Sequence, residues 1–484
     1  MPTSQSSVEA RSLLRAASIV TATRLVPGHG NPDRRHLVLL AETEPFDPPR
    51  AWTDESARAL AALFAARARR DALGLGSALI SRYFDAARLT RPATISMATR
   101  SLLYSSVGEY ACALGWPQVG ARFGDEALLF ADSDELRFYA LAVGAMGHAL
   151  NGEYESAAAG MASASELSHA YDWRDAIGPS YLLLLADSLV SSARMDHDRL
   201  TRVAEELAAL DPDDPYLDYS ARAIAVMCQL IRGEYADGIA GSWQLLHGSQ
   251  RHTSQRMIRD FLACIRSDML IAQGQYTEAL LSLTTSQNPE GHGICFSMQR
   301  SASLLLLGRE RDLLAETEGC VASEADHCLR TLTPVLLQRA IAFDRLGYER
   351  RAHQSMESAL LLIARTGNSM TPFIMLPPQE CANLVEKAVR AHPELTTTAN
   401  FIYAALDRVG APVALTPTAV ELPGFTPTER ALADALLSPL SLADIARERG
   451  VSPNTIKSQV RSIYLKLGVS GRSEAVEALR PLLE

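Results

Sequence analysis

The stretch of sequence that decides the fold of the chain's end reads Phe425-Thr-Pro-Thr-Glu-Arg430, then Ser441-Leu-Ala-Asp-Ile-Ala-Arg447, then Gly450-Val-Ser-Pro-Asn-Thr-Ile-Lys-Ser-Gln-Val-Arg461 and Lys466-Leu-Gly-Val469. It contains three helix starts, because Thr426, Ser441 and Ser452 can each accept a hydrogen bond from a backbone N–H in the turn that follows. Gly450 can end the middle helix in a left-handed conformation. A helix, a tight turn with Gly and a second helix together predict a helix-turn-helix.

The third predicted helix, 453–467, has two faces of different chemistry. Its apolar residues recur at the helical period and predict a buried stripe, made of Ile456, Val460, Ile463 and Leu467. The other face carries short or cationic donors, namely Asn454, Lys457, Ser458 and Arg461. Because a helix fits the major groove of DNA, where Lys and Arg donate to guanine, this face is expected to read base edges.

Basic charge is concentrated around this helix. From Ile445 to Arg472 there are six Arg or Lys and one acidic residue, a local net charge of +5, whereas the whole chain has a net charge of −10. A DNA backbone binds through its phosphates, so the cations lie where such a contact requires them. A capped helical bundle that docks a protein is the alternative interpretation of the same stretch.

This order of residues resembles the C-terminal DNA-binding domain of the LuxR family of bacterial transcription regulators. The matching positions are Phe425, Thr426, Glu429, Arg430, Asp444, Ile445, Ala446, Ser452, Thr455, Ile456, Lys457, Lys466, Leu467, Val469 and Arg472. The resemblance implies a small four-helix domain over 425–484. It also implies promoter DNA and RNA polymerase as partners.

The resemblance further implies which side chains meet DNA. The family's base-facing positions fall on Lys457, Ser458 and Arg461. Phosphate contacts are expected at three other positions, Thr455, Lys466 and Arg472. The family usually has His where this chain has Gln459, which leaves one local phosphate contact open.

Most of the remaining chain repeats one short pattern, Gly-x-Tyr-x-x-Ala. The pattern is read in Gly152-Glu-Tyr-Glu-Ser-Ala157, Gly233-Glu-Tyr-Ala-Asp-Gly238 and Gly274-Gln-Tyr-Thr-Glu-Ala279, and in part in Gly347-Tyr-Glu-Arg-Arg-Ala352. Weaker members begin at 76, 115, 193 and 308, so successive marks lie 34 to 41 residues apart. A period in this range is typical of a solenoid, whose units must stack because one unit cannot bury its apolar stripe alone.

The repeat resembles the tetratricopeptide repeat, although its period is longer than usual. HEAT-type repeats are the second choice because they lack the Gly-Tyr-Ala frame. Such an array joined to a LuxR-type terminus resembles MalT-like regulators, which normally also carry a nucleotide-binding module. This chain has no Gly-Lys pair and no lysine before Lys387, so it cannot form the P-loop of that ATPase.

Composition favours an all-α chain. Ala and Leu dominate and aromatic residues make up 6%. The seven cysteines are scattered and never form a C-x-x-C pair, which predicts buried free thiols in a reducing cytoplasm. No apolar run approaches the length of a membrane span, so no membrane partner is expected.

Four segments are expected along the chain. An N-terminal helix and an irregular connection occupy 1–50, because Pro and Gly punctuate 27–50; a short extended piece is expected at 36–40. The tetratricopeptide-like array follows over 51–409. Residues 410–424 form a Pro-rich linker, and 425–484 form the helix-turn-helix domain.

No catalytic or metal-binding motif stands out. His292-Gly-Ile-Cys295 and His327-Cys328 are too sparse to predict a metal site, and the acidic stretch from Asp211 to Asp218 lacks the Gly and final Glu of a calcium loop. No Gly-x-Ser-x-Gly elbow is present. The sequence therefore predicts neither an enzyme nor a bound metal or cofactor.

The resulting hypothesis is a DNA-binding transcription regulator, acting as a homodimer, whose array senses a small ligand or a partner protein. The alternative is a repeat scaffold whose terminal bundle docks a protein. Several aromatic residues could line a ligand surface, but we expect most of them to pack between helices: Tyr83, Phe84, Tyr104, Tyr110, Trp173, Tyr216, Tyr219 and Trp243.

Overall fold

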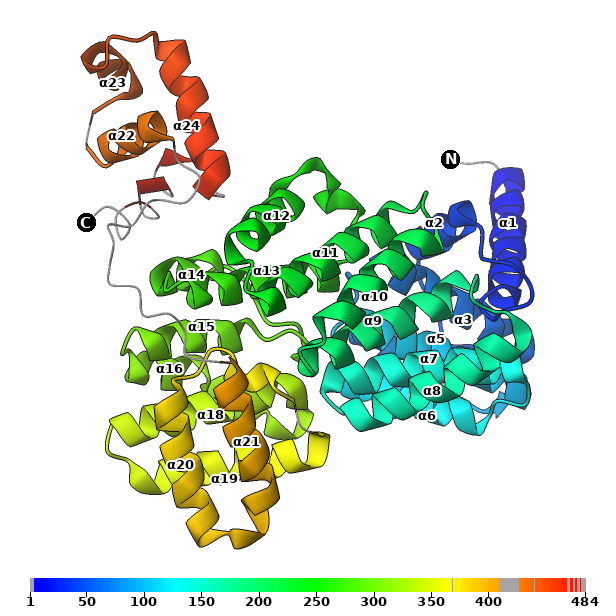
Figure 1. Cartoon of the computed structure of the whole chain (residues 1–484). Coiled ribbons are helices and arrows are strands. Elements are labelled where there is room, and N and C mark those ends of the chain that lie inside the picture. The colour runs from blue at the N-terminus through cyan, green and yellow to red at the C-terminus, as the bar shows by residue number, and fades with distance from the viewer. Residues whose placement is uncertain are drawn as a thin grey trace. The chain divides into compact units, whose positions relative to one another are not determined.

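The computed structural model describes residues 4–367, 369–409, 426–438, 440–467, 471–472, 475–476 and 479 of the 484. The chain divides into two compact units, Met1–Val413 and Ala414–Glu484. Both are helical, so the predicted all-α class is confirmed (Figure 1). The described strands have two residues each and form two separate two-stranded sheets: β1 (Trp52–Thr53) pairs in parallel with β4 (Ala93–Thr94), and β2 (Phe84–Asp85) pairs antiparallel with β3 (Arg88–Leu89).

The first unit is a series of helices that pack mainly on their neighbours in the chain. They are α1 (Ser4–Thr23), α2 (Arg34–Glu42), α3 (Asp54–Arg69), α4 (Ala78–Tyr83), α5 (Met97–Ala113), α6 (Pro117–Leu129), α7 (Asp134–Asn151), α8 (Tyr154–Tyr171), α9 (Ile177–Ala193), α10 (His197–Leu210), α11 (Pro215–Arg232), α12 (Tyr235–His247), α13 (Arg256–Ala272), α14 (Tyr276–Ser282), α15 (Phe296–Leu306), α16 (Glu310–Glu316), α17 (Glu318–Ala322), α18 (Leu329–Arg345), α19 (Glu349–Thr366), α20 (Pro378–Ala391) and α21 (Thr396–Val409). Short 3₁₀ turns join some of them, η1 (Ser249–Thr253), η2 (Glu324–Asp326), η3 (Thr371–Phe373) and η4 (Pro393–Leu395).

The N-terminal segment holds more regular structure than the sequence predicted. The prediction of an extended piece at 36–40 is wrong, because α2 covers these residues. Asp33 starts that helix by accepting a hydrogen bond from the Arg35 amide. Apolar residues of α1 and α2 belong to the same core as α3, so this segment forms part of the array's packing.

The repeated glycines lie between the two helices of successive hairpins. Six of them have φ between +69° and +92°, a region that side chains with a Cβ rarely adopt: Gly115, Gly152, Gly233, Gly274, Gly308 and Gly347. The weak mark at Ala193 differs, because Met195 takes the left-handed conformation there, with φ +57°. The predicted tetratricopeptide-like solenoid is confirmed by this series of hairpins.

The small residue of the repeat allows two helices to approach closely. Ala157, Ala279 and Ala352 are fully buried. At Gly238, which replaces the Ala, an added Cβ would meet the end of the Met269 side chain on α13. The sequence thus placed a small residue at every one of these helix contacts.

Most of the aromatic residues pack inside the array, as predicted. Tyr83, Phe84, Tyr104, Tyr110, Trp173 and Tyr219 are all 7% exposed or less, whereas Tyr216 and Trp243 are partly exposed. The ring of Phe84 lies 5.8 Å from that of Tyr104 in an edge-on contact. These rings therefore fill the space between helices.

The apolar core of the first unit has two main parts. One runs from Ala17 to Phe296 and the other from Leu304 to Leu406. All seven cysteines are buried free thiols. Within the described parts of the chain, none of the helices combines the length and the apolar character that crossing a bilayer requires.

Candidate nucleic-acid interface

The described helices of the second unit are α22 (Pro427–Leu436), α23 (Leu442–Glu448) and α24 (Pro453–Leu467). The predicted cap of α22 is confirmed. The Glu429 amide donates to Thr426 Oγ1 at 3.2 Å, and the Thr426 amide donates to Glu429 Oε2 at 2.8 Å. Two backbone donors of the first turn are therefore satisfied by this reciprocal pair.

The turn between α23 and α24 also follows the prediction. Ser441 and Asp444 form a capping box at the start of α23. Gly450 ends that helix with φ +67°, and the Thr455 amide donates to Ser452 Oγ at 3.1 Å at the start of α24. These local interactions set the helix-turn-helix geometry.

The apolar stripe of α24 is buried. Ile456, Val460 and Ile463 are at most 3% exposed, and they pack with residues of α22 and α23. The fourth predicted member, Leu467, and the linker 410–424 lie outside the residues whose side chains are described. The stripe therefore fixes which face of α24 remains free.

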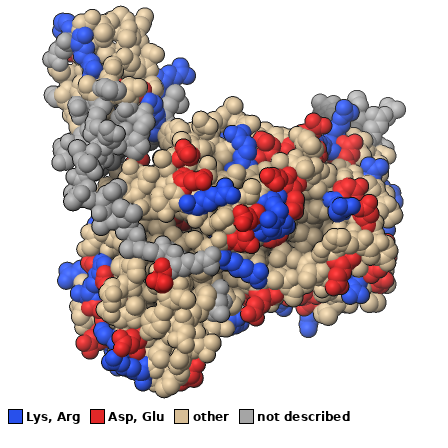
Figure 2. Space-filling view, viewed as in Figure 1, with Lys and Arg blue, Asp and Glu red and all other residues tan. Residues whose placement is uncertain are grey.

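The face opposite to the stripe is exposed. The side chains found there are Asn454, Thr455, Lys457, Ser458 and Arg461. Within the described part of the chain, neither the Lys457 ammonium nor the Arg461 guanidinium forms a hydrogen bond or an ion pair with another residue. Figure 2 shows Lys and Arg over the visible face of this unit with few Asp or Glu, whereas both signs are interspersed on the first unit. Gln459 lies at the edge of the exposed face, partly buried.

Two of the predicted phosphate contacts have partners within the unit. Lys466 Nζ lies 2.5 Å from Glu429 Oε2, and that carboxylate also accepts from Ser462 at 2.7 Å. The Arg472 guanidinium donates to the carbonyls of Leu436, Ser438 and Leu440, at the end of α22. Both cations hold α22 in place, and a phosphate contact by either stays a prediction.

Glu429 does more than cap α22, because its carboxylate also accepts from Ser462 and Lys466 of α24. Burial raises the pKa of its carboxyl, but the hydrogen bonds from Lys466, Ser462 and Thr426 outweigh burial and lower the pKa from 4.5 to about 2. Only the capping role of Glu429 was readable from sequence, because Ser462 and Lys466 lie more than thirty residues away.

One comparison with known protein families agrees with this geometry. The profile of the family described as bacterial regulatory proteins, luxR family, matches residues 423–479. No curated protein matches the chain. Among solved structures, one described as a Rap protein complexed with competence and sporulation factor is 14% identical. That match covers 74% of this chain and 96% of that chain, with a TM-score of 0.47. The C-terminal unit is thus a helix-turn-helix domain of the bacterial LuxR regulatory family.

Proposed function

We propose that this chain is a bacterial transcription regulator that binds promoter DNA through the exposed face of α24. The observation that carries the proposal is the division of that helix into a buried apolar stripe and a free face with Lys457 and Arg461. A free cation can donate to guanine N7 and O6 without first breaking an internal ion pair. Ser458, between them in sequence, offers a short hydroxyl to a base edge.

Two copies of the domain are expected on each promoter site. One recognition helix in the major groove contacts only a few base pairs, so a second copy on a paired half-site supplies the missing specificity. RNA polymerase is the expected protein partner of the bound regulator. The proposed activity is binding, without catalysis.

We further propose that the array receives its signal in a cavity of about 110 Å³ between α11, α13, α15 and α18. Its wall is mostly apolar and includes Met227, Ile265 and Met298. A dry cavity of about 150 Å³ holds benzene, so this cavity suits a ligand group of about six heavy atoms or fewer. The cavity borders both parts of the apolar core, so a ligand there would bias how the two parts pack.

Two polar side chains give the cavity its specificity. Gln299 Nε2 lies 3.4 Å from Asp268 Oδ2, while Gln299 Oε1 is buried without a hydrogen-bond partner. Burial raises the pKa of Asp268 to about 7, although its contact with Gln299 lowers it. An acceptor left unpaired in an apolar wall favours a ligand that brings a hydrogen-bond donor.

The DNA-binding proposal is tested by selecting target duplexes with the full-length protein and measuring affinity for target and random DNA. Lys457→Ala and Arg461→Ala are each expected to lose about 1–3 kcal/mol of discrimination between the two duplexes. The helical circular dichroism should stay unchanged, because both side chains are exposed. Arg174→Ala, an exposed cation of the array, is the matched control.

Full selectivity in both variants would overturn the proposed orientation of α24. A scaffold that docks a protein would instead select no duplex and would show no enriched motif after genome-wide immunoprecipitation. The cavity is tested separately with 2-methyl-1-propanol as the probe. A rise in the melting temperature of the full chain that Gln299→Leu abolishes supports the site, and no rise in the native protein overturns it.

A further inference from the structure

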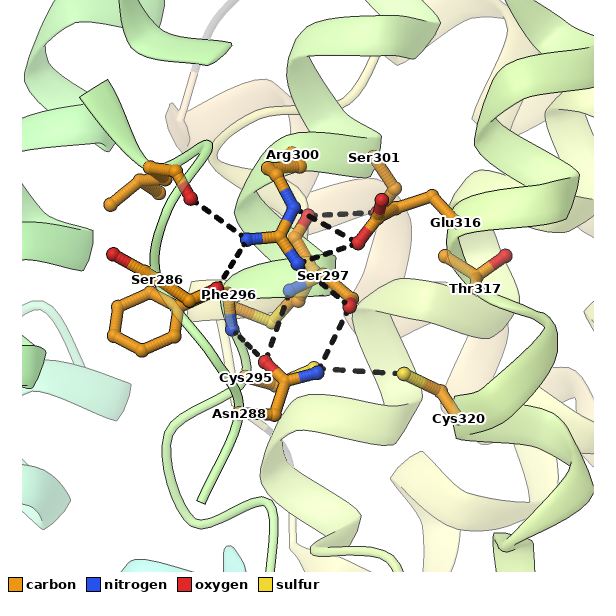
Figure 3. A network of polar contacts seen from close by, with 12 residues as sticks. Ser286, Asn288, Cys295, Phe296, Ser297, Arg300, Ser301, Glu316, Thr317 and Cys320 are labelled. Atoms are coloured by element: carbon orange, nitrogen blue, oxygen red, sulfur yellow. Dashed lines mark hydrogen bonds and ion pairs between the residues drawn. The ribbon is translucent and has the colours of Figure 1, made fainter. Parts of the chain in front are cut away.

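Four side chains that could bind a metal meet in the array. They are His292, Cys295, Cys320 and His327, and their ligand atoms lie within 4.8 Å of one another. His292 and Cys295 come from the loop before α15, Cys320 from α17, and His327 follows η2. Figure 3 shows Cys295 and Cys320 pointing toward each other, and their sulfur atoms are 3.7 Å apart.

The separation of the two sulfur atoms matches a tetrahedral metal site. Zn²⁺ binds thiolates at about 2.3 Å, so two sulfurs on a tetrahedron lie about 3.8 Å apart. The ligand atoms lie within 4.8 Å of one another, so each needs to move by only about 1 Å to close such a site, and three of the four residues lie outside helices. We propose that His292, Cys295, Cys320 and His327 bind one zinc ion.

The imidazole of His327 is already arranged as a ligand. Its Nδ1 lies 2.9 Å from the Cys328 carbonyl oxygen, which can only accept, so Nδ1 carries the proton. The lone pair is then on Nε2, which is buried without a hydrogen-bond partner. A carbonyl that fixes the tautomer of a metal-binding His is a frequent second partner in zinc sites.

His292 shows the same lack of a partner. Its Nδ1 is buried and unpaired, and its backbone has φ +50°, unusual for a residue with a side chain. The peptide bond between His292 and Gly293 is held at both of its polar atoms. Thr331 Oγ1 donates to the His292 carbonyl at 2.8 Å, and the Gly293 amide donates to the Gly115 carbonyl at 2.9 Å. Two unpaired buried nitrogens in one cluster are costly unless something fills the space between them.

The loop that carries two of the ligands is clamped by a polar network (Figure 3). Asn288 Oδ1 accepts from the Phe296 amide at 2.7 Å, which caps α15 directly after Cys295. Arg300 donates to the carbonyls of Leu283 and Ser286 at 2.9 and 3.0 Å, and it pairs with Glu316 at 2.7 Å. These contacts hold the backbone on either side of the Asn288–Phe296 bond in place without a metal, so the loop that carries Cys295 is ordered before any ion binds.

The charge balance suits a buried closed site. Zn²⁺ binding releases one proton from each cysteine, and the ion with two thiolates and two neutral imidazoles carries no net charge. Cys295, Cys320 and His327 are at most 2% exposed. Four protein ligands leave no open position, so the ion would be structural, tying the loop before α15 to α17 and to the segment before α18.

The sequence argued against this site, because its ligands are far apart in the chain. His292 and Cys295 have a ligand-like spacing, but the second pair begins 25 positions after Cys295, and six residues stand between its members, Cys320 and His327. The two pairs meet because α15 and α17 both pack against α18.

The proposal is tested on full-length protein purified without chelator from cells grown with zinc. About one zinc per chain is expected by elemental mass spectrometry. Cys320→Ser and His327→Gln should each lose it, while Cys381→Ser, an equally buried thiol of α20, should retain it. Replacement by Co²⁺ should give the visible bands of tetrahedral cobalt and thiolate charge-transfer bands in the near ultraviolet.

The cobalt spectrum of the native chain needs no variant, so a variant that fails to fold does not prevent a decision. Native protein that holds less than about a tenth of an equivalent of zinc and gives no cobalt bands would overturn the proposal. A Cys295–Cys320 disulfide without metal in protein kept under reductant would overturn it as well. Zinc retained in both ligand variants would place the ion elsewhere in the chain.

Discussion

The ammonium group of Lys466 at the end of α24 lies 2.5 Å from the carboxylate of Glu429 in the first turn of α22. The same carboxylate caps α22 and accepts from Ser462. Glu429 is 7% exposed, and this largely buried ion pair joins α22 to α24. Lys466 therefore supports the packing of the unit, whereas the exposed side chains of Lys457 and Arg461 are the ones proposed to contact DNA.

Lys466→Gln is expected to destabilise the second unit by about 1–3 kcal/mol, because Glu429 keeps its burial but loses its charged donor. The Lys466→Gln protein should still select the target duplex. The Arg461→Ala protein should lose this selectivity, while the stability of its second unit should stay unchanged. Hydrogen exchange of the α22 and α24 amides in the full chain measures the first effect. If Lys466→Gln removed selectivity without faster exchange, Lys466 would be a DNA contact and not a support.

Acid should loosen the second unit. The folded pKa of Glu429, about 2, lies below its ordinary 4.5, so this contribution is complete above about 4.5 and is lost as the pH falls toward 2. Hydrogen exchange in α22 and α24, corrected for its intrinsic pH dependence, should rise across that window. Glu429→Gln should flatten the change, leaving the smaller effect of Asp444, whose pKa is lowered by its hydrogen bonds to Ser441.

Binding to DNA should fall steeply with salt. Each phosphate neutralised by the protein contributes a slope of about −0.9 to the dependence of log K on log salt. Fluorescence anisotropy of a labelled target between low and physiological salt measures this slope. A flat dependence would contradict a phosphate-binding role for the basic region from Ile445 to Arg472.

The contact between α6 and α7 gives a matched pair of glycine substitutions. A Cβ on Gly124 would meet the backbone N of Gly144 at 2.5 Å, whereas a Cβ on Gly144 would meet nothing closer than Asp125 Oδ1 at 3.6 Å. Gly124→Ala should therefore destabilise the array by about 1–3 kcal/mol, because backbone must move.

Gly144→Ala should be neutral or stabilise the array by up to about 1 kcal/mol through helix propensity. Urea unfolding of the two variants measures the difference. Equal stability of the two would mean that the helices can separate at no cost, contrary to the packing described.

In the first unit, the sequence predicted the helical hairpins but missed one helix and one cavity. The Gly-x-Tyr-x-x-Ala frame predicted the hairpins, because each Gly supplies a left-handed turn within a few residues. The helix at 34–42 was missed because Pro and Gly on both sides hid a nine-residue helix started by Asp33. The cavity near Asp268 and Gln299 could not be predicted, because it depends on how α13 and α15 pack together.

The sequence by itself determined the helical hairpins, the caps of the helix-turn-helix and the two faces of α24, because each rests on contacts within a few residues. Only the tertiary structure decided that Lys466 and Arg472 support α22 while Lys457 and Arg461 stay free. It alone brought His292 and Cys295 to Cys320 and His327. The physical reason is that burial and pairing depend on residues far apart in the chain, whose separation no local spacing encodes.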